Sequence, residues 1–565
     1  MLRPLFLILV LTTASQALGQ SYVLQEDAPQ RVEPNPTKVQ PTEPLPQAES
    51  QPESQTESQT KSQTTEMQAF DFPANPQQFD QLLSESAPAN GLSQPSDRWQ
   101  QAETNETSSL VLPDVIASLY RSYPEINQAR QESRIAAGEH RSAYGAFDTK
   151  LKTASLNEPT GFYQNYRQSI GVARQTWWGG YVSAGYRIGR GTFQPWYTER
   201  QTDDAGEFKV GVSQPLIRGR AIDPQRVAVF RASLAKQAAH PQVKLAILQA
   251  ALDATSVYWK WVSAGAVLEA QRRLLKLAEE RGEQFEAGVK AGKFPEIDLI
   301  LNQQLIAERR AKTIESEQEF RAKGLKLSLF LRDSSGQPMV PGDDWLPTSF
   351  PEITAPQLSQ FETELAAAIA RRPELELLRL ARRDTELDFR LARNQLLPQV
   401  DFIAEASQDL GEQASSSVDD KGDFELVIGF QSEVPIQRRK ARGKIQSTSA
   451  KLNQIDQKFR LAQDKVGAEL RTSHNQIELT QKIVEQANIS LRAAHESLER
   501  YRFAFEKGKI DLLYLNLIET KANETEIKLA EAQASWFVVL GQLQFTLGLD
   551  PLDQAFAVNN PVDAK

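Results

Sequence analysis

The feature that most constrains this chain is a long, regular spacing of apolar residues in its C-terminal third. Apolar side chains recur every three or four positions from Leu452 to Phe505, and an earlier run from Leu234 to Val262 has the same spacing. Such spacing over many turns predicts helices that pack along one seam, as in a coiled coil. A helix from Ile445 to Lys507 would be about 95 Å long at 1.5 Å per residue. A globular domain needs nothing of that length, so we expect a rod or a tube.

Composition narrows the classes of function. The chain has 565 residues, of which 24% are charged and 40% hydrophobic, and its formal charge is −9. It is long enough for a large ordered body, and its acidity argues against nucleic acid as a partner. It contains no cysteine. Zinc–thiolate sites, disulfides, cysteine nucleophiles and a lipid anchor on an N-terminal cysteine are therefore excluded.

The N-terminal segment is typical of an exported protein. Residues 1–19 read as a signal peptide, with Arg3 before an apolar stretch at 5–11 and a small-x-small cleavage site at 17–19. A membrane anchor is the alternative, but the apolar stretch is too short to span a bilayer. Residues 20–107 are rich in Gln, Pro, Ser and Glu. They bury too little apolar surface to offset ordering entropy, which predicts a disordered tail.

The remainder of the chain looks duplicated. We expect a first repeat at 108–333, a linker at 334–357, a second repeat at 358–549 and a C-terminal tail at 550–565. Each repeat has the order helix, strands, long helix, Gly turn, helix. The difference in residue number between matching segments is larger for the first matched pair, at Pro124 and Pro373, than for the later pairs. The first repeat therefore carries about one extra hairpin. The matching segments surround Pro124 and Pro373, Pro215 and Pro435, and Gly292 and Gly508.

Between the matched prolines the apolar period changes to two, which predicts strands with one dry face. The second repeat has two such segments, with Val400, Phe402, Ala404 and Ala406 in one and Phe424, Leu426, Ile428 and Phe430 in the other. The first repeat has four, near 147–156, 166–174, 181–188 and 207–214. Their length is close to the ~9–11 residues of a tilted membrane-crossing strand.

Two architectures remain open for these strands. In a membrane barrel, the aromatic residues Trp177, Trp178, Tyr181, Trp196 and Tyr197 would lie at the membrane interfaces. In a soluble β-sandwich, they would be core residues. The export signal and the duplication favour the barrel.

No catalytic or metal-binding motif stands out. There is no nucleophile elbow, phosphate-binding glycine loop or His-Glu-x-x-His motif. The four histidines are scattered, and His474 and His495 are expected to be exposed helix residues rather than a metal pair. We therefore expect neither an enzyme nor a cofactor. A basic cluster at 438–442, with a counterpart at Arg218 and Arg220, either flanks a helix start or marks where strands leave a membrane.

With these features in place, residues 108–549 resemble the TolC-type outer-membrane efflux protein family (outer membrane factors). The most specific element is the turn between paired long helices, where the family shows a glycine and, six positions later, an acidic residue. Gly292 and Asp298 match this pattern. In the second copy Gly508 is followed by Asp511, three positions early, and Tyr514 stands where the acid is expected.

The resemblance implies an α+β fold, internally duplicated, in which a trimeric transmembrane β-barrel continues into a long periplasmic α-helical coiled-coil barrel. It implies a homotrimer in outer-membrane lipid that acts as a passive exit duct for efflux or type I secretion. Its partners would be a periplasmic adaptor (membrane fusion) protein and an inner-membrane transporter that drives export. The residues agree on physical grounds, since six strands cannot close a barrel around a water-filled lumen, whereas several chains can.

The chain departs from the family in its extra strands. The family usually has two strands per repeat, so the additional pair would enlarge the barrel or form an external or plugging hairpin. The alternative function is that of an exported periplasmic coiled-coil structural or adaptor protein that never enters the outer membrane.

The resemblance also points to candidate site residues. Gly292, Asp298, Gly508, Asp511 and Tyr514 would form the periplasmic tip or gate. Lys293 and Lys509 would lie near the adaptor surface. A carboxylate repeated threefold would favour cations. Alternatively, Asp298 and Asp511 only favour the N-terminal dipole of the helix that follows.

Overall fold

The computed structural model describes residues 109–193, 200–292, 295–354, 356, 360–412 and 424–550. These residues belong to one compact unit of the chain. The predicted signal peptide, N-terminal tail and residues 551–565 lie outside them, as do Lys293, Trp196 and Tyr197.

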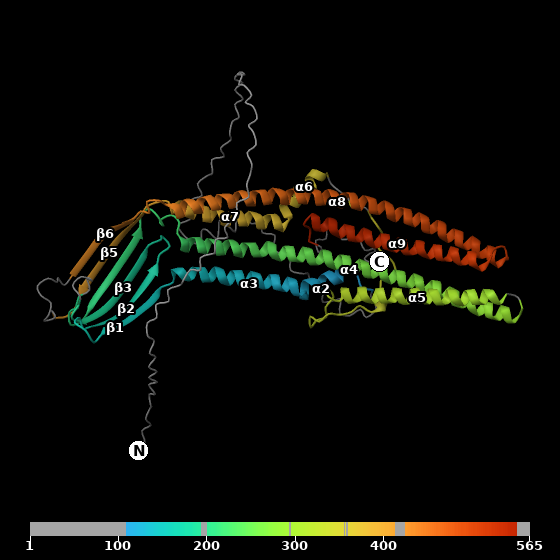
Figure 1. Ribbon diagram of the computed structural model, residues 1–565, viewed down its shortest axis with the longest axis horizontal. Coiled ribbons are helices and arrows are strands. Elements are labelled where there is room, and N and C mark those ends of the chain that lie inside the picture. The colour runs from blue at the N-terminus through green and yellow to red at the C-terminus, as the bar shows by residue number, and fades with distance from the viewer. Residues whose placement is uncertain are drawn as a thin grey trace, which may run out of the picture. The chain divides into compact units, whose positions relative to one another are not determined.

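Four long helices form two hairpins (Figure 1). The first hairpin joins α4 (Pro224–Lys290) to α5 (Glu296–Leu327), and the second joins α8 (Arg439–Glu506) to α9 (Leu512–Thr546). Shorter helices pack beside them: α2 (Leu112–Ser122), α3 (Pro124–Tyr144), α6 (Phe361–Arg371) and α7 (Pro373–Asn394), with 3-10 turns η3 (Gly145–Phe147) and η5 (Asp343–Trp345). Among the described residues, no helix is apolar enough over a sufficient length to cross a membrane.

The predicted seams are confirmed. Along α8 every seam residue from Leu452 to Phe505 is buried or half-buried, and the seam of α4 is likewise covered. The α4 helix begins where the sequence provides both a cap and a proline. The Asp223 carboxylate accepts a hydrogen bond from the Arg226 backbone N–H at 2.8 Å, and Pro224 occupies the first turn, where its missing N–H costs nothing.

The strands form one antiparallel sheet in the order β1-β2-β3-β4-β5-β6. Their bounds are β1 Lys150–Glu158, β2 Asn165–Gln175, β3 Tyr181–Gly191, β4 Glu207–Pro215, β5 Gln399–Asp409 and β6 Phe424–Glu433. The first repeat thus supplies four strands and the second two, as predicted. The repeats meet where β4 pairs with β5, from Glu207↔Asp409 to Pro215↔Asp401. The described strands do not form a sandwich, because all six belong to this one sheet.

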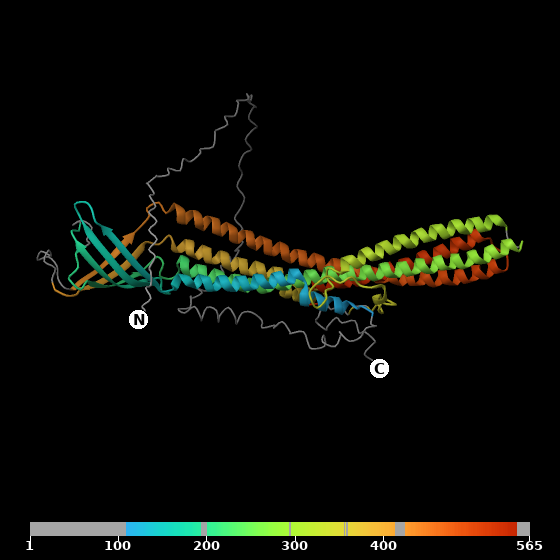
Figure 2. The ribbon, with the colours of Figure 1, turned by 90° about the horizontal axis from the view of Figure 1, so that it is seen from below.

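The largest core lies where the two hairpins and α2 meet. Trp259 of α4 stacks on Phe537 of α9 with ring centroids 4.1 Å apart, and Trp261 stacks on Phe320 of α5. A second, smaller core lies near the sheet, around Phe230 and Leu387. The sheet lies at one end of the helices in this unit, and both hairpin turns lie at the other (Figure 2).

Two sequence-based assignments need correction. Trp177 is not at a free sheet surface: it packs edge-on against Phe230 and contacts Phe147, so it belongs to the core beside the sheet. His474 is not a plain exposed helix residue either. It is half-buried, and its Nε2 lies 2.7 Å from the Glu364 carboxylate of α6, an arrangement that joins α6 to α8.

Candidate functional site

One face of the sheet is apolar from strand to strand. The register aligns Val172, Ala184, Val210, Ala406 and Leu426 in a single row across β2 to β6, with Leu151 of β1 at its end. Phe430 on this face is 70% exposed. We call this surface the apolar sheet face. Its exposed large side chains are Leu151, Tyr166, Ile170, Val172, Val182, Phe208, Val210, Val212, Phe424, Leu426, Ile428 and Phe430.

The opposite face of the same strands is mostly polar and charged. Lys209 of β4 pairs with Glu405 of β5 at 2.6 Å, and Arg167 of β2 pairs with Glu158 of β1 at 2.7 Å. Leu156 and Val427 are its exposed apolar exceptions. Alternate residues of a strand point to opposite faces, so the period of two in the sequence places apolar and polar groups on separate surfaces. We call the second surface the polar sheet face.

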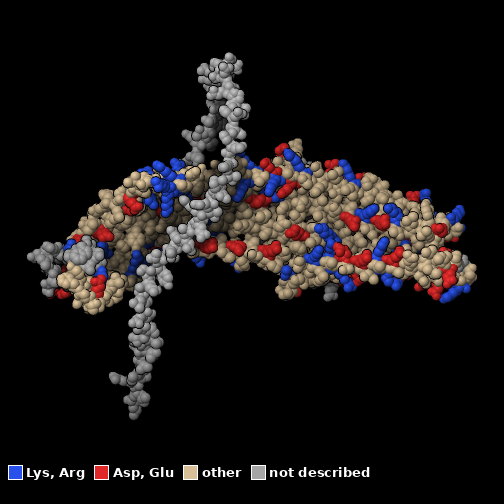
Figure 3. All heavy atoms as spheres, viewed as in Figure 1, with Lys and Arg blue, Asp and Glu red and all other residues tan. Residues whose placement is uncertain are grey.

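Charged side chains are distributed unevenly on the surface. On the face of the molecule drawn in Figure 3, Lys, Arg, Asp and Glu are scattered along the helices, and fewer lie over the sheet. The sheet and the helices thus offer different surfaces to their surroundings. A soluble monomer rarely exposes an apolar patch as extensive as the apolar sheet face, so this surface marks an interaction with lipid or protein.

The hairpin turns are built around glycines, as the sequence indicates. Gly292 and Gly508 have φ of 68° and 67°, in the left-handed region that glycine enters without a steric penalty. The N–H of Gly508 donates to the Phe505 carbonyl at 2.8 Å, and that of Lys509 donates to the Ala504 carbonyl at 2.9 Å. This is the Schellman pattern that ends a helix and reverses the chain.

The remaining candidate tip residues surround the second turn and the start of α5. Asp511 caps α9, because its Oδ1 accepts a hydrogen bond from the Tyr514 backbone N–H at 2.8 Å. Asp298 lies in the first turn of α5 and is half-buried, and Lys509 is exposed. The Tyr514 ring lies 5.3 Å from that of Tyr501, and the hydrogen bond between the two side chains raises the pKa of Tyr514.

The structure thus assigns Asp511 a capping contact and brings Asp511 and Tyr514 together. The position of Asp298 in a first turn is likewise the position where a carboxylate favours the helix dipole. These contacts agree with the capping alternative. They leave a role in an entrance as a prediction.

A buried ionic network that sequence inspection missed joins the two hairpins. Glu519 of α9 is 1% exposed and contacts the guanidinium groups of Arg281 of α4 and, at 3.2 Å, Arg309 of α5. Arg281 also donates to Asn516 Oδ1 at 2.8 Å, and Arg309 donates to the Leu274 carbonyl at 3.0 Å. Burial lowers the pKa of Arg309, and the attraction of Glu519 opposes that shift.

One sequence signal could have revealed this network. Leu512, Leu515, Glu519 and Ala522 follow the three-four spacing of the α9 seam, and all four are buried. A carboxylate at a seam position requires a partner, because an unpaired buried charge is very costly. Arg309 is the corresponding charged residue among the buried positions of α5.

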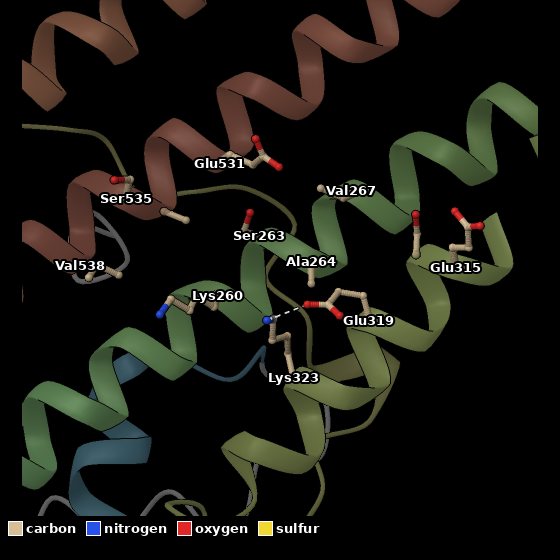
Figure 4. A pocket seen from close by; sticks show the side chains of 12 residues that line it. Lys260, Ser263, Ala264, Val267, Glu315, Glu319, Lys323, Glu531, Ser535 and Val538 are labelled. Atoms are coloured by element: carbon tan, nitrogen blue, oxygen red, sulfur yellow. Dashed lines mark ion pairs between the residues drawn. The ribbon is translucent and has the colours of Figure 1, made fainter. Parts of the chain in front are cut away.

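A groove of about 520 Å³ lies where α4, α5 and α9 come together, beside the main core (Figure 4). Lys260 and Ser263 of α4, Glu319 of α5, and Glu531 and Ser535 of α9 are among the side chains around it. Glu319 is paired with Lys323 one turn later on α5, at 2.6 Å. Small residues and locally paired charges suit a helix–helix groove. They do not form a convergent set of catalytic groups.

Residues 365–549 match the family described as "Outer membrane efflux protein". No curated protein matches the sequence at a significant level.

Three solved structures illustrate the likeness in fold. The CmeC outer membrane channel of Campylobacter jejuni is 11% identical with a TM-score of 0.56, and the alignment covers 80% of this chain and 87% of that one. The outer membrane protein VceC of Vibrio cholerae is 16% identical with a TM-score of 0.55, and the alignment covers 77% of this chain and 96% of that one. The open state of the MtrE outer membrane channel of Neisseria gonorrhoeae is 14% identical with a TM-score of 0.56, and the alignment covers 78% of this chain and 89% of that one.

The sequence match covers most of the second repeat, and the shared fold extends over both repeats. This agrees with the independent observations above: duplicated helical hairpins, glycine-centred tips and a sheet with one exposed apolar face. Residues 365–549 therefore carry the sequence pattern of the outer membrane efflux protein family, and the chain shares the fold of the solved outer membrane channels.

Proposed function

We propose that this protein is the exit duct of an efflux or type I secretion system, a passive channel through the outer membrane with a helical extension into the periplasm. The observation that carries the proposal is the apolar sheet face. Its large side chains are exposed on β1 to β4 and on β6 and half-exposed on β5, and the opposite face of the same strands is polar and ion-paired. A wall between lipid and water needs these two surfaces back to back.

A closed wall requires several copies of the chain. In hydrocarbon every backbone N–H and C=O must find a partner within the protein, so an open sheet edge is not tolerated. Six strands from one chain enclose no aqueous lumen, whereas three copies together can. We therefore propose a homotrimer whose sheets share one barrel and whose long hairpins form one tunnel.

The basic segments beside the sheet fit this placement. Arg218 and Arg220 lie between β4 and α4, Arg438 lies between β6 and α8, and Arg439 begins α8. Both segments connect a strand end to a helix start. At that level the chain would leave the membrane, and cationic side chains there suit the boundary between lipid headgroups and water.

The hairpin tips form the proposed periplasmic entrance. They are the parts of the described unit furthest from the sheet (Figure 2). Asp298, Asp511 and Tyr514 are the residues proposed to line it, and the Glu519 network is proposed to hold the two hairpins of one copy together behind it. Lys293 and Lys509 are proposed to contact a periplasmic adaptor protein, and an inner-membrane transporter would supply the energy.

Fractionation and conductance test this function. We expect the protein in the outer-membrane fraction, as a trimer that resists SDS until it is heated, with discrete conductance steps in a planar bilayer. The matched variant Phe430→Asp, on the apolar sheet face, should lose trimer and conductance, and Gln431→Asp, on the polar sheet face, should keep both. Extraction with the soluble periplasmic fraction would instead favour the coiled-coil structural or adaptor function.

A further inference from the structure

The extra strands of the first repeat belong to the main sheet. The pairing between β2 and β3 runs unbroken from Asn165↔Gly191 to Gln175↔Tyr181, and β1 pairs with β2 along its whole length. A hairpin that plugged a lumen or lay outside the wall would leave this ladder. Instead, the apolar and polar faces continue across β2 and β3 in register with β4 to β6, and Leu151 carries the apolar face onto β1.

The two edge strands of this sheet, β1 and β6, are suited to pair with each other between neighbouring copies. Among the described strands, β1 and β6 each have a neighbour on one side only. They are similar in length, nine and ten residues, and mostly exposed. An even number of strands makes β1 and β6 run in opposite directions, so β6 of one copy meets β1 of the next in the antiparallel sense of all the other pairs.

The charges at the strand ends also favour contact between β6 of one copy and β1 of the next. Lys150 begins β1 and Glu433 ends β6, so both lie at the end of the sheet that faces the helices. The register places both on the polar sheet face, because the paired positions Lys150↔Ala173 and Gln399↔Glu433 lie on the same face of the sheet as the Lys209–Glu405 pair. Opposite charges across a strand pair favour this pairing.

We propose that three copies close an 18-stranded barrel through contact of β6 with β1 of the next copy, rather than the 12-stranded barrel that two strands per repeat would give. This inference rests on the trimeric duct proposed above and specifies its width. With strands about 4.8 Å apart and tilted about 40°, each strand adds roughly 6 Å of circumference. The backbone diameter is then about 36 Å, against about 24 Å for twelve strands.

The wider wall has a functional consequence. Barrels of 16–18 strands leave an open aqueous channel. The membrane part of this duct would then impose little size selection of its own. Selection by size would fall to the helical tunnel and its tips, and the outlet would accept any cargo that passes them.

Two other arrangements would give twelve strands. If the β1–β2 hairpin lay outside the wall, β3 would become the edge that meets β6 of the next copy. If the β2–β3 hairpin lay outside, β1 would pair directly with β4 of its own chain. Each alternative places a different strand pair in contact, so disulfide trapping separates them.

The chain has no cysteine of its own, so introduced pairs report without background. Ala154→Cys on the polar sheet face of β1 is combined in turn with Val427→Cys, Gly429→Cys or Gln431→Cys on the same face of β6, which scans the unknown register. Ser183→Cys of β3, with the same three partners, is the matched control. Membranes are oxidised and resolved on a denaturing gel, with single-cysteine variants for comparison.

We expect at least one Ala154 combination to give covalent dimers and trimers that disappear on reduction, and the Ser183 combinations to stay at the single-cysteine level. Interchain bonds from Ser183 instead would place the β1–β2 hairpin outside the wall. A further pair, Ala154→Cys with Gly211→Cys, tests the second alternative. In the described sheet these residues are three strands apart and also offset along the strands, so more than about 14 Å separates them, too far for a disulfide. An intrachain bond there would overturn the inference.

The remaining outcomes separate the inference from the function. A conducting, heat-stable trimer with no bond from any Ala154 combination would refute the 18-stranded closure and leave the duct intact. A monomer without conductance would refute the duct and the closure together.

Discussion

Replacing Glu519 by glutamine is expected to loosen the two helical hairpins from each other. The substitution keeps the shape of the side chain but removes the charge that faces Arg309 and Arg281, whose side chains are 4% and 13% exposed. Removing one partner of a buried ion pair typically costs about 3–5 kcal/mol, because the remaining charge is left without compensation. Each 1.4 kcal/mol changes an equilibrium constant by a factor of ten, so local opening of the hairpins should become roughly 100- to 5,000-fold more frequent.

Amide hydrogen exchange of the intact trimer measures this opening. We expect faster exchange in peptides of α9 around Glu519 and in the facing segments of α4 and α5. Glu524→Gln on the same helix is the matched control. Glu524 is half-exposed and forms a long ion pair of 3.5 Å with Lys521, and such a surface pair stabilises a protein by less than about 1 kcal/mol. Adding Arg309→Met to Glu519→Gln should restore part of the protection. Exchange in Glu519→Gln no faster than in Glu524→Gln would refute the reasoning.

Three further predictions concern the tips and the sheet. Gly508→Ala should cost about 1–2 kcal/mol through its positive φ alone, since a Cβ there meets nothing within 4 Å, and unchanged helix protection would contradict this. Asp511→Ala should destabilise the start of α9 by about 1 kcal/mol. If Asp511 or Asp298 lines the entrance, its replacement by alanine should also change cation selectivity in a planar bilayer, and unchanged selectivity would reduce both to helix caps. Phe430→Arg should cost about 2–4 kcal/mol in lipid and lower the yield of heat-stable trimer, whereas Gln431→Arg on the opposite face should not.

Local periodicity predicted most of the fold because it is written in consecutive residues. The three-four spacing of α8 and the period of two in β5 and β6 each place one face inward or outward without reference to any distant segment. The glycine turns were also predictable, since a positive φ requires glycine at Gly292 and Gly508. The sequence contained all of these signals at short range.

Long-range partners were not predictable in the same way. The Glu519 network joins residues more than 200 positions apart, and nothing local identifies Arg281 or Arg309 as its partners. The position of Trp177 in a core depends on Phe230, which comes from another element. Pro241 lies buried inside α4, where a proline ordinarily predicts a helix boundary. There tertiary packing along the seam overrides the local preference.

Electron-microscopic imaging of the purified full-length protein in lipid nanodiscs tests the central claim most directly. The account predicts particles with threefold symmetry, an open lumen along the axis, and a helical cylinder projecting from one side of the membrane disc only. Single chains, or particles without a lumen that leave the disc empty, would contradict the claim that this chain builds a duct.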